Sequence, residues 1–175
     1  MILSNIVSDQ SDNAYFISCS SLIKIDSSNS VVWSYKISGP VDFEYGKKQI
    51  KIGSDGNLII LCKNDVTYSN LTLMKVDSST GSIMWQYVFG SEDPTFTYLY
   101  INDITLDDSN NIYMCGTVPS IDGNTNRGYV ISIDYDGGLI WQRFISIPYD
   151  AYGYVELLSI CIYKPHPGDA DELIM

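Results

Sequence analysis

The chain has 175 residues, is 45% hydrophobic, and carries 10 Lys and Arg against 21 Asp and Glu, for a formal net charge of −11 at pH 7. This acidic balance argues against binding to nucleic acid or to anionic membrane surfaces, because both need clustered basic side chains. No apolar run approaches the roughly 18 residues of a membrane-spanning helix. The first residues lack the basic and apolar regions of a signal peptide, and the compartment stays open.

A repeat organises the sequence. An Asp followed seven or eight residues later by a Trp occurs three times, with the tryptophans 52 and 56 residues apart. A second pattern precedes each copy, in which an Asp leads a Cys by seven residues. Because two separate patterns recur together, the chain is predicted to consist of structural repeats. The repeated turn and packing residues are Asp26, Trp33, Asp77, Trp85, Asp134 and Trp141.

Short β-rich segments separated by Gly, Asn, Asp and Ser predict four strands in each repeat. The first repeat predicts strands at 3–8, 15–19, 22–25 and 31–37. The second predicts strands at 49–53, 58–62, 73–76 and 83–89, and the third at 103–106, 111–115, 129–133 and 139–145. A fourth repeat begins with strands at 155–163 and 172–175. No segment has the apolar period of a helix.

Four short antiparallel strands in a repeated unit are typical of β-propeller blades. The predicted fold is therefore all-β, with a single partial propeller domain at 1–175 and about three and a half blades. Blade 1 is predicted at about 1–39, blade 2 at about 40–90, blade 3 at about 91–147 and the start of blade 4 at about 148–175. Propellers usually close with about four to eight blades. We therefore expect either the remainder of a longer propeller or self-association.

The cysteines show no CxxC spacing, so zinc and thioredoxin-like sites are not predicted. Cys19, Cys62 and Cys115 are expected at equivalent positions of successive blades as small buried hydrophobes, with Cys161 apart from them. His166 lies between two prolines and has no Ser or Cys partner in a motif, which argues against catalysis. The Asp-rich segments at 122–126 and 134–137 fit ordinary turns better than calcium loops.

The segment from Val76 to Trp85, Val-Asp-Ser-Ser-Thr-Gly-Ser-Ile-Met-Trp, resembles the PQQ-like propeller repeat. The resemblance implies a propeller fold and no particular activity, since both quinone-cofactor dehydrogenases and outer-membrane assembly scaffolds share the repeat. The quinoprotein enzymes carry a calcium ion, a catalytic aspartate and often a vicinal cysteine pair, and no motif here matches them. No catalytic, cofactor-binding or metal-binding residue is therefore predicted, and no cofactor.

The connections at one end of the predicted blades differ from those at the other end in having variable length and composition. The links between the second and third strands, and between successive blades, vary in length, whereas the remaining turns are short. Variable loops on a rigid scaffold often bind partners, although these aromatics could equally wedge between blades. The candidate binding residues on these links are Phe43, Tyr45, Asp93, Phe96, Tyr98, Tyr149, Asp150 and Tyr152.

The predicted function is a non-enzymatic scaffold or binding module that acts through this loop face, most simply on protein. Acidic and tyrosine side chains would also suit a carbohydrate, so a lectin-like propeller is one alternative. A fragment of a PQQ-type oxidoreductase is the other alternative.

Overall fold

A computed structural model describes residues 5–18, 21–36, 48–63, 71–89, 100–119, 126–145, 155–163 and 172–174. These parts consist of strands, turns and extended chain, and among them no helix is long and apolar enough to cross a membrane. The chain divides into two compact units, Met1–Phe89 and Gly90–Met175. Each unit is described by itself.

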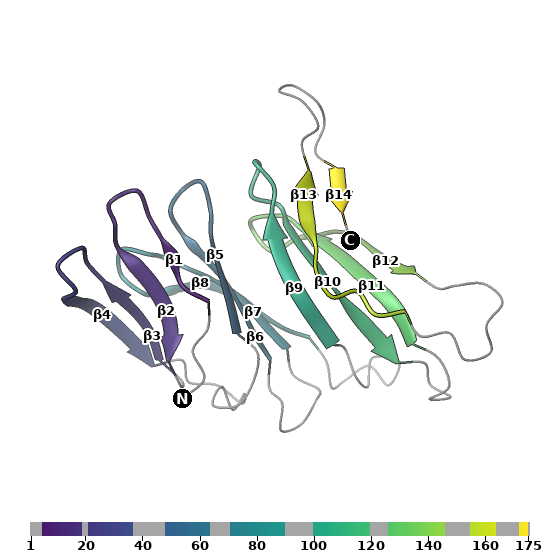
Figure 1. The fold of residues 1–175 in the computed structure, drawn as a ribbon, viewed down its shortest axis with the longest axis horizontal. Coiled ribbons are helices and arrows are strands. Elements are labelled where there is room, and N and C mark those ends of the chain that lie inside the picture. Colours follow the sequence, from purple (N-terminus) through teal and green to yellow (C-terminus); the bar gives the residue numbers. More distant parts are fainter. Residues whose placement is uncertain are drawn as a thin grey trace. The chain divides into compact units, whose positions relative to one another are not determined.

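The first unit contains two four-stranded antiparallel sheets. In both, the strands are hydrogen-bonded in chain order, so each sheet is a simple meander (Figure 1). The first sheet comprises β1 (Val7–Ser8), β2 (Ala14–Ser18), β3 (Ser21–Ile25) and β4 (Val31–Lys36). The second sheet comprises β5 (Lys48–Ile52), β6 (Leu58–Lys63), β7 (Leu71–Val76) and β8 (Ile83–Phe89).

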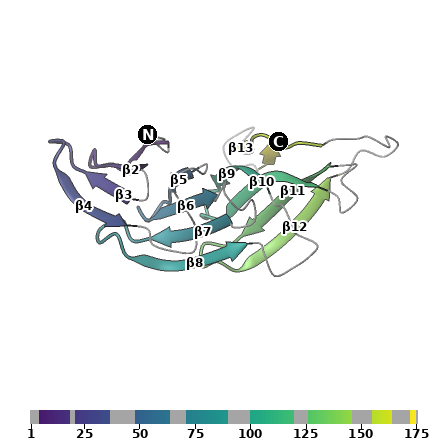
Figure 2. The ribbon, with the colours of Figure 1, turned by 90° about the horizontal axis from the view of Figure 1, so that it is seen from below.

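The second unit repeats this arrangement once and then begins another sheet. Figure 2 shows the strands of the third sheet in chain order, as in the sheets of the first unit. This third sheet comprises β9 (Tyr100–Leu106), β10 (Ile112–Pro119), β11 (Asn126–Ile133) and β12 (Leu139–Ile145). A two-stranded antiparallel sheet follows, made of β13 (Cys161–Tyr163) and β14 (Glu172–Ile174).

The predicted fold class is confirmed. The structure is all-β, with three four-stranded antiparallel sheets that are consistent with propeller blades. In each of them the last two strands carry a register shift just before the tryptophan, at Ile25, Val76 and Ile133. A bulge at the same place in all three four-stranded sheets shows that the repeat seen in the sequence is also a repeat of backbone geometry.

Some strand boundaries were wrong. The strand predicted at 155–163 is shorter, because 155–160 is extended chain without strand pairing and β13 begins at Cys161. Conversely, β10 continues to Pro119. Gly116 suggests the end of a strand by its type, yet it lies inside the ladder at a register shift. A Cβ there would collide with the carbonyl oxygen of Tyr100, so glycine permits the close approach of β9.

The core of the first unit lies between its two sheets. Side chains from one face of the first sheet pack against side chains from one face of the second, with Trp33 partly buried at the margin. Because residues two apart in a strand share a face, each sheet contributes alternate residues. The buried members of this cluster are Tyr15, Ile17, Leu22, Ile50, Leu58, Ile60, Cys62, Met74 and Val76.

The cysteine equivalence predicted from the sequence was wrong for the two positions that the structure describes. Cys62 packs with the first sheet, which precedes it in the chain, whereas Cys115 packs with Ile160, which follows it. These two cysteines therefore point to opposite sides of their sheets. The seven-residue spacing from Asp to Cys was misleading because the two aspartates occupy different positions of their turns. Asp55 lies one residue before the positive-φ residue Gly56, whereas Asp108 lies two residues before the positive-φ residue Asn110. Cys19 lies outside the described residues.

Candidate functional site

The turn before each tryptophan is built around its repeated aspartate. Asp26 Oδ1 accepts hydrogen bonds from the backbone N–H groups of Ser28 and Ser30, both at 2.9 Å. Asp77 and Asp134 accept backbone N–H groups of their own turns in the same way. The hydrogen bond from the Ser28 hydroxyl, together with those from the backbone, lowers the pKa of Asp26. These aspartates act as local turn acceptors.

The first turn of the first sheet holds a more enclosed aspartate. Asp9 Oδ1 accepts the backbone N–H groups of Ser11 and Asn13, and Oδ2 accepts the Asn13 amide and the Tyr15 hydroxyl, both at 2.8 Å. Burial opposes the charged form of this carboxyl, but the hydrogen bonds outweigh burial and hold the pKa of Asp9 at about 2. Asp9 therefore joins the turn to a tyrosine of the core.

The same turn recurs in the third sheet. Asp107 accepts the Asn111 amide at 2.8 Å and the Tyr113 hydroxyl at 3.1 Å. The second sheet has Gly53 at this position, and its turn uses Asp55 to accept the side-chain amide of Asn57 at 2.8 Å. The first and third sheets are thus more alike at this turn than either is to the second.

Side chains of one sheet also bind the backbone of the next sheet. Asn5 accepts the N–H of Ile50 and donates to its carbonyl, both at 2.8 Å, so the amide pairs with Ile50 as a neighbouring strand would. In the second unit Asp103 accepts the N–H of Ile160 at 3.1 Å and the Ser159 hydroxyl at 2.7 Å. Asn5 and Asp103 both lie four residues before their turn aspartates, Asp9 and Asp107, so the connection is a repeated one.

Trp33 forms a further contact between the two sheets of the first unit. Its indole N–H donates to the Ser78 carbonyl at 3.1 Å, and the Lys24 ammonium donates to the same oxygen at 3.2 Å. Gly81, with φ of +77°, lies so close to the indole that an added Cβ would be 3.1 Å from a ring carbon. The turn of the second sheet therefore fits against Trp33 through one carbonyl and one glycine.

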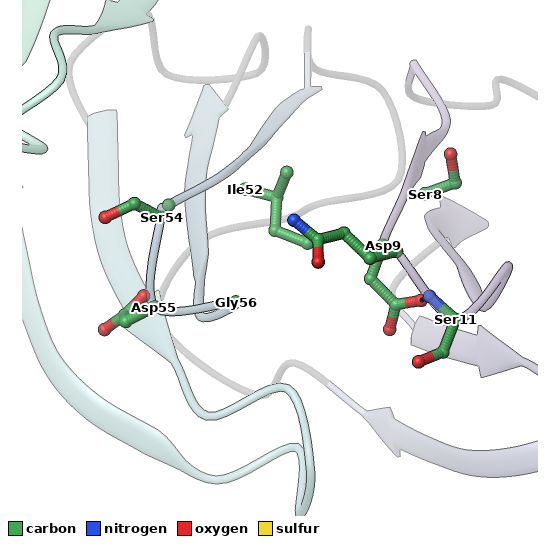
Figure 3. A pocket seen from close by; sticks show the side chains of 9 residues that line it. Ser8, Asp9, Ser11, Ile52, Ser54, Asp55 and Gly56 are labelled. Atoms are coloured by element: carbon green, nitrogen blue, oxygen red, sulfur yellow. Dashed lines mark hydrogen bonds between the residues drawn. The ribbon is translucent and has the colours of Figure 1, made fainter.

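A groove of about 490 Å³ opens between the first turns of the two sheets of the first unit. Figure 3 shows that Ser8, Asp9 and Ser11 come from one side and Ile52, Ser54, Asp55 and Gly56 from the other. Apart from Ile52, the lining side chains are polar or absent. The complete lining is Ser8, Asp9, Gln10, Ser11, Ile52, Gly53, Ser54, Asp55 and Gly56.

Hydrogen bonding is the chemistry that this groove offers. Its hydroxyls and carboxylates suit a hydroxyl-bearing or cationic ligand. Asp55 also forms an ion pair with the buried Lys75 ammonium, at 3.7 Å. Within the part of the chain that the structure describes, no group of three or more His, Cys, Asp or Glu is placed to hold a metal ion.

The outer edge of each four-stranded sheet presents a second kind of surface. β4, β8 and β12 are edge strands, and the residue just before the tryptophan is apolar and exposed in all three. Exposure of these residues is 50% at Val32, 53% at Met84 and 49% at Ile140. Other exposed apolar side chains on the same strands are Val31, Tyr35, Tyr87, Val88, Leu139 and Phe144.

The binding face predicted from the sequence lies outside the described residues, at 37–47, 90–99 and 146–154. The eight residues of this face are therefore not tested by the structure. The repeated tryptophans, by contrast, lie on β4, β8 and β12, each partly buried. Sequence reasoning missed Asn5, Asp103 and the groove. The fixed distance from each turn aspartate back to Asn5 and Asp103 was the available signal.

Comparison with known proteins gives no functional assignment. No protein-family model matches the chain. No curated protein matches it. It is similar to a solved structure described as a protein of unknown function from Bacteroides caccae, with 15% sequence identity and a TM-score of 0.49. The match covers 79% of this chain and 48% of that one, so the chain spans about half the length of that protein.

Proposed function

We propose that this protein is a non-enzymatic propeller-type module of the PQQ-like kind that binds other protein chains. The observation that supports protein binding is the apolar outer edge, which recurs at the same position of three sheets. Edge strands present unpaired backbone groups, and an added strand from a partner satisfies them. Exposed apolar side chains on both sides of the tryptophan add buried area to such a contact.

The polar turns support a scaffold role, because their aspartates are engaged in holding the turns together. The turn aspartates direct their oxygens to backbone N–H groups and neighbouring side chains of their own turns, as Asp9 and Asp77 show. Groups engaged in this way rigidify the sheets and position the edges. In a binding module of this type, the turns maintain the structure and the edge strands contact the partner.

Charge substitution on the outer edge tests the proposal. A triple variant with Val32→Lys, Met84→Lys and Ile140→Lys should lose a partner that copurifies with the wild-type chain from its own cells, as measured by native mass spectrometry. All three side chains are about half exposed, so the melting temperature should change little. A variant that retains the partner would contradict the proposed edge.

The groove favours a second candidate, a carbohydrate-binding module. Serine hydroxyls and carboxylates line it, and these groups form hydrogen bonds with sugars. Ser11→Lys with Ser54→Lys distinguishes the two functions, because both residues lie in the groove and not on β4 or β8. These substitutions should leave protein binding intact. Glycan-array binding that they abolish would instead favour the carbohydrate function.

The non-enzymatic part of the proposal has its own test. Addition of PQQ with calcium should produce neither a change in the visible spectrum nor a rise in melting temperature. Reduction of an electron-acceptor dye under these conditions would favour the oxidoreductase alternative.

A further inference from the structure

The outer edge strands of the three four-stranded sheets differ in charge. β4 ends in the exposed Lys36, and β12 carries the exposed Arg143. β8 has the sequence Ile-Met-Trp-Gln-Tyr-Val-Phe and contains no charged residue. Charged side chains on an edge strand oppose the pairing of that strand with another chain. Of the three outer edges, β8 is therefore the one that lacks this protection.

Both faces of β8 offer apolar area beside its unpaired backbone. Met84, Tyr87 and Val88 are each about half exposed. Met84 and Val88 lie on one face of the strand, and Tyr87 lies on the other face with Trp85, because side chains alternate along a strand. The rings of Trp85 and Tyr87 are 5.5 Å apart. A strand added to this edge would cover apolar side chains on both faces.

The residue two positions after each tryptophan is where β8 and β12 diverge. It is Tyr35 in β4, Tyr87 in β8 and Arg143 in β12. The Arg143 guanidinium lies 5.0 Å from the Trp141 ring centroid, much as the Tyr87 ring lies beside its own tryptophan. The repeat therefore accepts either side chain at this position, and only the arginine brings a charge to the edge.

The sequence of β8 is complementary to itself. Gln86 is the central residue of the strand. In an antiparallel pair of two copies centred on this residue, apolar side chains would face apolar ones and aromatic side chains would face aromatic ones, which are favourable cross-strand pairs. The facing pairs would be Ile83 with Phe89, Met84 with Val88, and Trp85 with Tyr87.

The other two outer edges are less suited to pairing with themselves. The same arrangement of β12, centred on Gln142, would place the two Arg143 side chains diagonally across the pair, where like charges repel. In β4 it would place Lys36 opposite Val31. The charge pattern thus favours a second copy at β8 alone.

We propose that β8 pairs antiparallel with β8 of a second copy of this chain, about a twofold axis at Gln86. Such a contact uses the same surface on both partners, as twofold dimers do. The inference rests on the proposed function, because it assigns one of the apolar outer edges to a particular partner. Each chain carries a net charge of −11, so salt should strengthen the dimer by screening the repulsion between the copies.

Sedimentation velocity of the complete chain over a range of concentrations tests the proposal. The wild-type chain should form a dimer, which should be tighter in about 0.5 M than in about 0.05 M NaCl. Tyr87→Arg should weaken the dimer at least about tenfold, because two like charges then lie diagonally across the axis. Tyr35→Arg is the matched control at the equivalent position of β4, and it should leave the dimer unchanged. Circular dichroism checks that both variants are folded.

A cysteine at the axis tests the register. Gln86→Cys should give a disulfide between the two copies on mild oxidation, identified by mass spectrometry of the linked peptides. Gln142→Cys on β12 is the control and should give none. A dimer without the disulfide at residue 86, or one that Tyr87→Arg and Tyr35→Arg weaken equally, would overturn the proposal.

The state of the wild-type chain separates this proposal from the proposed function. A monomeric chain would overturn pairing through β8. If that monomer bound a different protein, and the triple lysine variant lost it, binding at the outer edges would stand without the dimer. A monomer whose protein partner survives the triple substitution would contradict both.

Discussion

Trp33 and Trp141 occupy the same position of the repeat, in the first and third sheets, but they make different contacts. Trp33 donates to Ser78 and packs beneath Gly81. Trp141 adopts nearly the same geometry toward its tyrosine, but its indole ring has the Arg143 guanidinium 5.0 Å from its centroid. The difference shows that a repeat fixes how a side chain is presented, while the neighbouring sheet determines which contacts it makes. The predictions below test this comparison.

The largest effect is expected from truncating the cores beside the two tryptophans. Ile60 is fully buried and Ile160 is 3% exposed. Ile60→Ala and Ile160→Ala should each reduce the free energy of unfolding by about 2–5 kcal/mol. Chemical denaturation measures both, with the half-exposed Val32→Ala as a control that changes stability by less than about 0.5 kcal/mol. A small loss at Ile160 alone would show that the core beside Trp141 is not organised like the core beside Trp33.

Next in size is the contact between Gly81 and Trp33. Gly81→Ala should cost about 2–4 kcal/mol, because the substitution combines strain at positive φ with overpacking against the indole. Gly56→Ala is the matched control, with φ of +81° and no heavy atom closer than 4.0 Å. It should cost only the strain, about 1–2 kcal/mol. Equal losses of stability in Gly56→Ala and Gly81→Ala would show that the indole contact does not contribute to the cost at Gly81.

Substituting the two side chains that bind the next sheet, Asn5 and Asp103, should reduce stability by a smaller amount that differs between the two positions. Asn5→Asp loses the donor to the Ile50 carbonyl and places two oxygens together, at a cost of about 1–3 kcal/mol. Asp103→Asn keeps an acceptor for Ile160, so its cost should stay below about 1 kcal/mol. Thermal unfolding of both variants checks the order. The reverse order would mean that these bonds do not join the sheets as described.

The smallest expected effect is the contribution of the first turn to the pH dependence of stability. The folded-state pKa of Asp9 is about 2, below its ordinary value of 3.8. The stabilisation is therefore present above about pH 4 and is lost as the pH falls towards about 2. Asp9→Asn should flatten this part of the stability profile relative to wild type. An unchanged profile in urea titrations from pH 2 to 5 would contradict the role assigned to Asp9.

Most of the fold was predictable because it depends on local patterns. The turn signals around Asp26, Asp77 and Asp134 fixed the hairpins, and the apolar runs between them fixed the strands. Predicted strand boundaries were wrong where a tertiary contact outweighs the preference of the residue type. Gly116, for example, lies within β10 because β9 passes close to it. The cysteine equivalence failed because sequence spacing does not register which side of a strand faces a neighbour, and Cys62 and Cys115 differ in that respect.

The candidate sites were less predictable. The groove forms from two turns that are distant in sequence, and neither turn alone carries a ligand motif. The exposed outer strands could be read as core strands, because Val32, Met84 and Ile140 are apolar and adjoin a tryptophan. Only the strand order shows that these residues lie at a sheet edge. The loop face predicted from Phe43, Tyr98 and their counterparts remains a prediction.

Trp33→Phe and Trp141→Phe, compared by native-state hydrogen exchange, test the central claim most directly. Both substitutions remove the same atoms, but among the residues that the structure describes only Trp33 of the two has an acceptor in its own unit, at Ser78. The opening free energy of β2 and β3 should fall by about 1 kcal/mol more in Trp33→Phe than that of β10 and β11 falls in Trp141→Phe. Equal losses in the two sheets would show that the next sheet does not determine what each tryptophan contributes.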